Sequence, residues 1–97
     1  MGEDGHIASI FPNMAMAADG QPAIVRAVPD PLPVQAPFAR LTLNFAALAD
    51  AGEIMLVARG AAKRAMLLDA IAGRHDLPIA RLVAASNSPL TIFWSGE

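Results

Sequence analysis

The sequence predicts an α/β fold with a mainly parallel sheet and flanking helices. Strand-like and helical patterns alternate from residue 40 to the C-terminus, and Gly or Pro separates most of these segments. The run Glu53–Ala58 is apolar almost without interruption, which is typical of a parallel strand buried on both faces. We therefore expect residues 53–58 to form a central strand that is covered on both sides.

The first forty residues carry weaker patterns. Residues 1–12 predict a loop that enters a short helical turn and stops at Pro12, and Ala23–Val25 predicts a short strand. Three prolines between residues 29 and 33, and a fourth at 37, exclude a helix or a central strand there. That stretch is either disordered or a rigid surface loop.

The first regular elements follow residue 39. Arg40–Leu43 predicts a strand, and Asn44 is suited to cap a short helix over Phe45–Ala51, which Gly52 would end. After the strand at 53–58, the clearest helical pattern covers Gly60–Ala72 and stops at Gly73. Its expected apolar face is Ala61, Ala65, Leu68 and Ala72.

Two elements complete the chain. Pro78 fits the first turn of a helix that continues through Val83. Leu90–Trp94 predicts the last strand. Met14, Met16 and Trp94 are expected to be packing residues.

Composition narrows the functional classes. Of 97 residues, 55% are apolar and 16% are charged, against about 25% charged in an average domain. This high apolar content predicts that the chain buries apolar surface either against another chain or within a larger α/β domain. We favour the larger domain because the candidate catalytic motif begins at residue 4, with almost no chain before it.

Several classes are excluded. A net charge of −2 does not suit nucleic-acid binding, and no apolar run is long enough to span a membrane. The acidic start is unlike a signal peptide, and the lack of Cys excludes disulfides, thiolate metal sites and a Cys nucleophile. The cytoplasm is the expected compartment.

The first candidate site is Asp4-Gly5-His6. An imidazole titrates near neutrality, a nearby carboxylate can orient its ring, and glycine lets the backbone turn sharply between them. The alternative is a solvated pair near a terminus. The tripeptide alone does not decide between these readings.

The second candidate site is Arg59–Lys63, which follows an apolar strand and begins a helix. Ligands of open α/β sheets bind beyond the carboxyl ends of strands, and a helix N-terminus attracts anions. Two cations at that end indicate a phosphate or carboxylate ligand. The equal alternative is that both side chains reach solvent, at a helix-dipole cost of only about a few tenths of a kcal/mol.

The other candidate residues give weaker evidence for a functional site. Arg40 alone would be a surface residue, and His75 is expected in a solvated loop. Two histidines without helical pairing do not make a metal site, and no Gly-x-Ser-x-Gly elbow surrounds a serine.

The run Met1–Pro12 resembles the signature loop of 6-phosphogluconolactonases, Gly-x-Gly-x-Asp-Gly-His-x-Ala-Ser-x-Phe-Pro. Arg40–Leu43 is similar to the family's Arg-(Ile/Val/Leu)-(Thr/Ser)-Leu strand, and Arg59–Lys63 to its Gly-x-x-Lys segment. Glucosamine-6-phosphate deaminases share the Asp-Gly-His-Ile-Ala core but continue with Phe-Asn-Glu-Pro. Ser9–Pro12 lacks that glutamate, which favours the lactonase.

The resemblance implies a Rossmann-like domain that hydrolyses 6-phosphoglucono-1,5-lactone to 6-phosphogluconate in the oxidative pentose phosphate pathway, without a metal or organic cofactor. His6 would be the general base, and Asp4 would orient the site or polarise the sugar. Arg40 and Lys63 would hold the 6-phosphate, with Arg59 as a weaker candidate.

Members of that family also carry, upstream, a Gly-Gly-Ser/Thr-Pro phosphate loop and an Asp-Glu-Arg segment, and neither occurs in residues 1–97. We therefore expect a single incomplete domain, the C-terminal portion of a lactonase, with impaired activity. An exposed sheet edge predicts self-association or pairing with a missing N-terminal half. The alternatives are a noncatalytic sugar-phosphate-binding or self-assembling remnant and, less favoured, a deaminase or isomerase.

Overall fold

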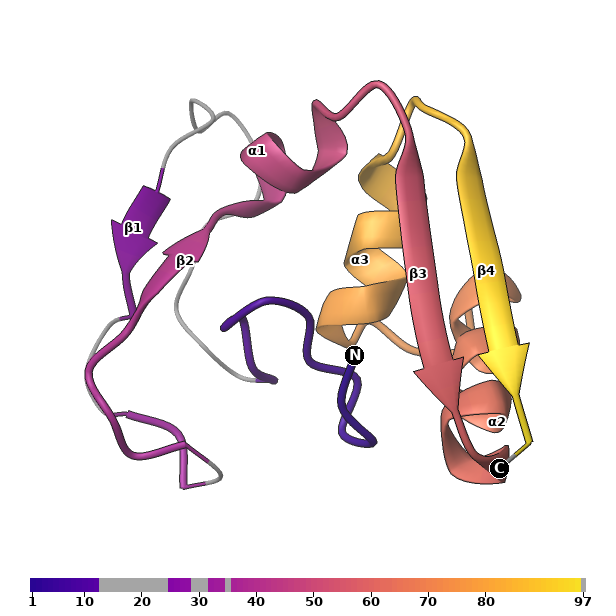
Figure 1. Ribbon diagram of the computed structural model, residues 1–97, viewed down its shortest axis with the longest axis horizontal. Coiled ribbons are helices and arrows are strands. Elements are labelled where there is room, and N and C mark those ends of the chain that lie inside the picture. Colours follow the sequence, from indigo (N-terminus) through magenta and orange to yellow (C-terminus); the bar gives the residue numbers. More distant parts are fainter. Residues whose placement is uncertain (13–24, 29–31, 35, 97) are drawn as a thin grey trace.

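Strands and helices alternate along the chain in the computed structural model, which describes residues 1–12, 25–28, 32–34 and 36–96 (Figure 1). The elements are β1 (Val25–Ala27), β2 (Leu41–Leu43), α1 (Phe45–Ala49), β3 (Ile54–Arg59), α2 (Ala61–Ile71), α3 (Pro78–Ala85) and β4 (Leu90–Ser95). Strands β3 and β4 pair in parallel, whereas β1 and β2 form a separate antiparallel pair. The predicted α/β class is confirmed.

The parallel pair β3–β4 and its two connecting helices form the larger of the two structural units of the described chain. β3 and β4 align from Ile54 beside Leu90 to Arg59 beside Ser95, and α2 and α3 lie against one face of the pair (Figure 1). The core between them contains the fully buried Ile79. Ile7 and Ile10 of the N-terminal loop belong to the same core, so the loop packs as part of this unit.

The prediction that β3 is buried on both faces is wrong for the described chain. Burial alternates along the strand, and Met55 and Val57 are 65% and 70% exposed. Their face continues onto β4 through Phe93, which pairs with Val57 and is 52% exposed. The sequence shows that both faces are apolar, but α2 and α3 cover only one of them.

The limits of α2 agree with the prediction to within a residue, and Gly73 follows its end with φ of 72°. Its buried face is different from the expected one. Leu67 and Ala70 are buried, whereas Leu68 is 47% exposed. Apolar residues occur on every side of this helix, so periodicity alone does not select the face that packs.

The other two helices follow their sequence signals closely. Asn44 caps α1 as predicted, because its Oδ1 accepts a hydrogen bond from the Ala47 amide at 2.9 Å. The helix then ends at Ala49, two residues early. Pro78 begins α3, which continues two residues beyond Val83.

The N-terminal segment contains no helical turn. Ile7 and Ile10 instead exchange two backbone hydrogen bonds across a tight reverse turn, in which Ala8 has φ of 48°. The expected strand lies at Val25–Ala27, while Ala23 and Ile24, like Met14 and Met16, lie outside the described residues. None of the described helices is both long and apolar enough to cross a membrane.

Candidate active site

The N-terminal loop is supported by elements that lie far from it in sequence. The Ile79 amide at the start of α3 donates to the Gly5 carbonyl at 3.0 Å. The Ser9 amide donates to Oγ1 of Thr42 in β2 at 3.1 Å. Together with the burial of Ile7 and Ile10, these bonds hold the loop in place. Residues later in the chain therefore give the motif the rigid support that the few residues before it do not.

Two glycines let the loop close around the histidine. The Gly2 amide donates to the His6 carbonyl, and the Gly5 amide donates to the Gly2 carbonyl, both at 3.0 Å. A Cβ on Gly2 would collide with the His6 ring. Gly5 has φ of +85°, and a Cβ there would lie 3.0 Å from Cβ of Leu77. Both positions therefore require glycine, because a side chain there would clash with a neighbouring residue or strain the backbone.

We expect Gly5→Ala to lower the free energy of unfolding by more than about 2 kcal/mol, because it adds a contact with Leu77 to a backbone cost of about 1–2 kcal/mol. Urea unfolding measures the change. Gly73→Ala is the first control, since its φ is +72° but nothing lies near its Cβ. Gly52→Ala, in open space with no such φ, is the second. Equal losses at Gly5 and Gly73 would contradict the role of the Leu77 contact.

Asp4 and His6 form a close pair. Oδ1 of Asp4 lies 2.6 Å from Nδ1 of His6 and also accepts the His6 amide at 3.0 Å. Partial burial by itself would raise the pKa of Asp4, but the bonds from the His6 amide and ring outweigh it and lower that pKa. The carboxylate is therefore ionised near neutral pH and can only accept hydrogen bonds.

This pair sets the tautomer of the neutral ring. An ionised carboxylate at Nδ1 requires the proton on that nitrogen, which leaves Nε2 as the acceptor. Phe11 stacks on the ring with centroids 4.4 Å apart and an interplanar angle of 30°. The His6 side chain remains 30% exposed. The result is an oriented imidazole that water and a small substrate can reach.

Thr42 is a supporting residue that sequence reasoning did not identify. It is only 4% exposed, and its Oγ1 donates to the Leu43 carbonyl while accepting the Ser9 amide. One hydroxyl thus fixes β2 to the loop behind His6. The only sequence signal was a Thr in the strand that resembles the family's strand, where it was not assigned a role.

Thr42→Val is expected to destabilise the fold by about 1–3 kcal/mol, because the Ser9 amide loses its acceptor in a partly buried setting. Thermal or urea unfolding gives the value. Thr91→Val, at an exposed position in β4, is the matched control and should change stability by no more than about 0.5 kcal/mol. A Thr42 variant as stable as the control would show that this bond contributes nothing.

The three expected phosphate-binding cations occupy different places. Lys63 lies near the start of the loop: burial, and secondarily the Lys63 ammonium, lower the pKa of the Met1 amino group. Arg59 is exposed at the end of β3, and Arg40 is exposed just before β2. Within the described residues these three side chains form no ion pair. The structure thus brings Lys63 to the loop but does not join Arg40 or Arg59 to the Asp4–His6 pair.

His75 and Trp94 differ from expectation. Nε2 of His75 donates to the Met66 carbonyl at 3.2 Å, and Nδ1 accepts the Leu77 amide at 3.3 Å, so the ring connects α2 to α3. Trp94 is 42% exposed, and its Nε1 donates to the Gly60 carbonyl at 2.8 Å. The described residues contain no cluster of three metal-ligating side chains.

Comparisons with known proteins agree on one group. The family profile described as glucosamine-6-phosphate isomerases/6-phosphogluconolactonase matches residues 1–94. A 6-phosphogluconolactonase of Rhizobium meliloti is 35% identical over 98 residues, which cover 98% of this chain and 42% of the relative. One from Caulobacter vibrioides is 39% identical over 98% of this chain and 41% of its own length.

A solved structure gives the same grouping. The 6-phosphogluconolactonase from Trypanosoma cruzi superposes with a TM-score of 0.71 at 26% identity, over 97% of this chain and 36% of its own. The chain thus spans about two fifths of the length of the curated relatives that it matches.

Proposed function

Because the chain belongs to the glucosamine-6-phosphate isomerase/6-phosphogluconolactonase family, we propose that it takes part in hydrolysis of 6-phosphoglucono-1,5-lactone to 6-phosphogluconate in the oxidative pentose phosphate pathway. The relatives named above are called lactonases. The sequence Ser9-Ile10-Phe11-Pro12 also lacks the glutamate expected of a deaminase. The cytoplasm, where sugar phosphates are metabolised, is the compartment we propose.

The Asp4–His6 pair carries this proposal. In the proposed reaction, Nε2 of His6 takes a proton from water as the water oxygen attacks the lactone carbonyl carbon. Asp4, 2.6 Å from Nδ1, stabilises the imidazolium that forms. The tetrahedral intermediate then breaks its bond to the ring oxygen, and His6 returns the proton to that oxygen. The products are the open-chain acid and the starting form of the imidazole.

Lys63 is the cation best placed to hold the 6-phosphate. It lies in the first turn of α2 near the start of the signature loop, where backbone N–H groups also favour anions. Arg40, exposed two residues before Thr42, is proposed as a second phosphate ligand. Arg59, next to the N-terminus of α2, is the weaker third. No metal or organic cofactor is needed for this reaction.

The direct test compares hydrolysis of 6-phosphogluconolactone by the 97-residue chain with its spontaneous hydrolysis in the same buffer. Formation of 6-phosphogluconate above the spontaneous rate supports the proposal. A rate equal to the spontaneous one, for a chain shown to be folded, rejects catalysis by this chain alone.

A second candidate function is sugar-phosphate binding without turnover. Two observations favour it: the described residues do not join Arg40 or Arg59 to the Asp4–His6 pair, and the chain spans 42% of a matching lactonase. Calorimetry with 6-phosphogluconate separates the two functions. Binding without hydrolysis supports this second function, whereas neither binding nor hydrolysis rejects both.

We also propose that two copies of the chain associate through the exposed face of β3 and β4. Val57 and Phe93 are paired neighbours on that face, and both are more than half exposed. An exposed apolar face of this kind marks an interaction site, and in a dimer with a two-fold axis the same face of each copy meets the other.

Val57→Lys is expected to shift the chain from dimer to monomer, because it places a charge at the centre of that face. Light scattering across a range of protein concentrations measures the mass. Leu68→Lys, at a 47% exposed position on α2, should leave the dimer intact. A wild-type chain that stays monomeric at high concentration would overturn the proposal.

A further inference from the structure

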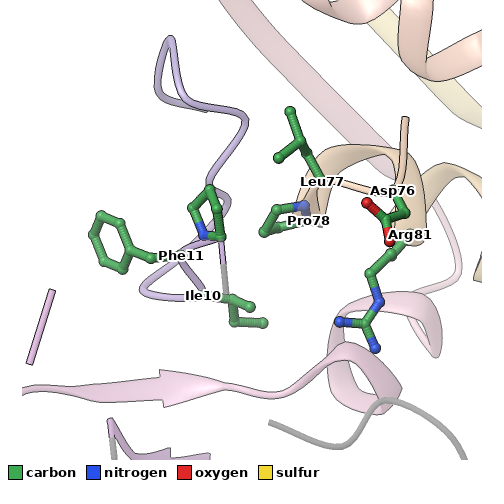
Figure 2. A pocket seen from close by; sticks show the side chains of 7 residues that line it. Ile10, Phe11, Asp76, Leu77, Pro78 and Arg81 are labelled. Atoms are coloured by element: carbon green, nitrogen blue, oxygen red, sulfur yellow. The ribbon is translucent and has the colours of Figure 1, made fainter. Parts of the chain in front are cut away.

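The signature loop and the start of α3 line a cavity of about 210 Å³ that the proposed hydrolysis does not use (Figure 2). Its lining combines five apolar residues with two charged ones, and polar atoms make up most of the wall surface. Ile10, Phe11 and Pro12 come from the loop, and Leu77 and Pro78 come from the start of α3. The volume is below the about 300–1,000 Å³ of sites for drug-sized ligands, so it suits a small metabolite.

Arg81 gives the cavity a positioned cation. Its guanidinium carbon lies 4.7 Å from the centroid of the Phe45 ring, and this cation–π contact holds the side chain in place. A guanidinium stacked in this way can still use its in-plane N–H donors. Figure 2 shows Arg81 and Ile10 reaching toward the cavity from different elements. Among the described residues, Arg81 has no ion-pair partner.

The cavity also contains an acceptor. Asp76 lines it two residues before α3 and does not pair with Arg81. Its carboxylate accepts hydrogen bonds and repels a dianion such as phosphate. The best complement to this pair is therefore a ligand with one negative charge for Arg81 and a hydroxyl donor for Asp76.

We propose that this cavity binds a small hydroxylated carboxylic acid, with the carboxylate on Arg81, a hydroxyl on Asp76 and the carbon chain against Ile10 and Leu77. This site adjoins the Asp4–His6 pair through Phe11, which lines the cavity and stacks on the His6 ring, but His6 itself does not line the cavity. Binding here therefore does not depend on the proposed lactone hydrolysis.

The first experiment is an NMR titration of the ¹⁵N-labelled chain, following the Nε–H of Arg81 and the amide of Leu77. Gluconate is the probe. Hexanoate has the same number of carbons without hydroxyls, glucitol has the hydroxyls without the carboxylate, and inorganic phosphate is the simple anion. We expect gluconate to bind at least tenfold more tightly than each of the other three. Phosphate or hexanoate binding as tightly as gluconate would overturn the assignment of ligand class.

Variants then locate the site. Arg81→Met keeps a long unbranched side chain but removes the guanidinium, with its charge and its contact with Phe45, and should weaken gluconate binding at least tenfold. The affinity of Arg81→Lys for gluconate should fall between those of Arg81→Met and wild type. Asp76→Asn should reduce the preference for gluconate over hexanoate. The amide spectrum away from the cavity reports whether each variant is folded.

His6→Gln distinguishes this proposal from the proposed function. It removes the stacking of His6 on Phe11, a wall of the cavity, but it should weaken gluconate binding far less than Arg81→Met does while removing hydrolysis. If His6→Gln abolishes gluconate binding and Arg81→Met does not, the ligand occupies the His6 site and the cavity proposal is wrong. If hydrolysis is absent but Arg81-dependent binding remains, only the proposed function fails.

Discussion

His6→Gln is expected to reduce the rate of lactone hydrolysis by about 10²–10⁴-fold, the usual contribution of a positioned general base. Glutamine fills a similar volume but cannot take up a proton at neutral pH. The ring's contacts with Asp4 and Phe11 are lost in the same change, so the folded fraction must be measured with the rate. The assay follows 6-phosphogluconate formation above the spontaneous background.

His75→Gln is the matched control for this substitution. His75 is the other histidine of the chain, and its ring connects Met66 to Leu77 instead of entering the candidate site. It should lower stability while leaving the rate per folded molecule unchanged. Equal loss of rate in the two variants would point to unfolding, and unchanged rate in His6→Gln would remove His6 from the mechanism.

The sequence predicted those parts of the fold that depend on neighbouring residues. Asn44 caps α1 through an amide three residues away, and Pro78 begins α3, so each signal lies beside its effect. The faces of β3 and α2 were predicted wrongly because burial depends on what packs against an element. Val57 is as apolar as a core residue yet 70% exposed, because no described element covers it.

The same distinction applies to the candidate site. Asp4 and His6 are two residues apart, so their pairing could be predicted from spacing. The contact of Ser9 with Thr42 joins residues 33 apart in sequence, and the bond from Ile79 to Gly5 spans still more of the chain. No local pattern reports such contacts, although they support the loop that presents His6.

Replacement of Asp4 by Asn is expected to lower the hydrolysis rate by up to about 10⁴-fold, the loss found when a catalytic imidazole is held in the wrong tautomer. The amide of Asn can donate its N–H to Nδ1 of His6 by giving up the bond that Oδ1 accepts from the His6 backbone amide in the wild type, and this would move the ring proton to Nε2, the atom proposed to act as base. The wild-type carboxylate cannot do this because it only accepts. The rate should fall although the side-chain size hardly changes.

The pH dependence of stability gives an independent signature of the same carboxylate. The folded-state pKa of Asp4 is lowered from its ordinary value of 3.8. Its contribution to stability is therefore fully present above that value and is lost as pH falls through the lowered pKa. Urea unfolding between neutral pH and acid should show a smaller acid loss in Asp4→Asn than in wild type. Parallel pH curves would contradict the Asp4–His6 bond.

Ring nitrogen NMR separates a change of tautomer from a general loss of structure. In the wild-type neutral rings, His6 should carry its proton on Nδ1 and His75 on Nε2, because Asp4 accepts from the first and the Met66 carbonyl accepts from the second. Asp4→Asn should move the His6 proton to Nε2 and leave His75 unchanged. If the His6 proton stays on Nδ1 while the rate falls, Asp4 acts through its charge on the imidazolium and not through the tautomer. If both rings change, the substitution has disturbed the fold.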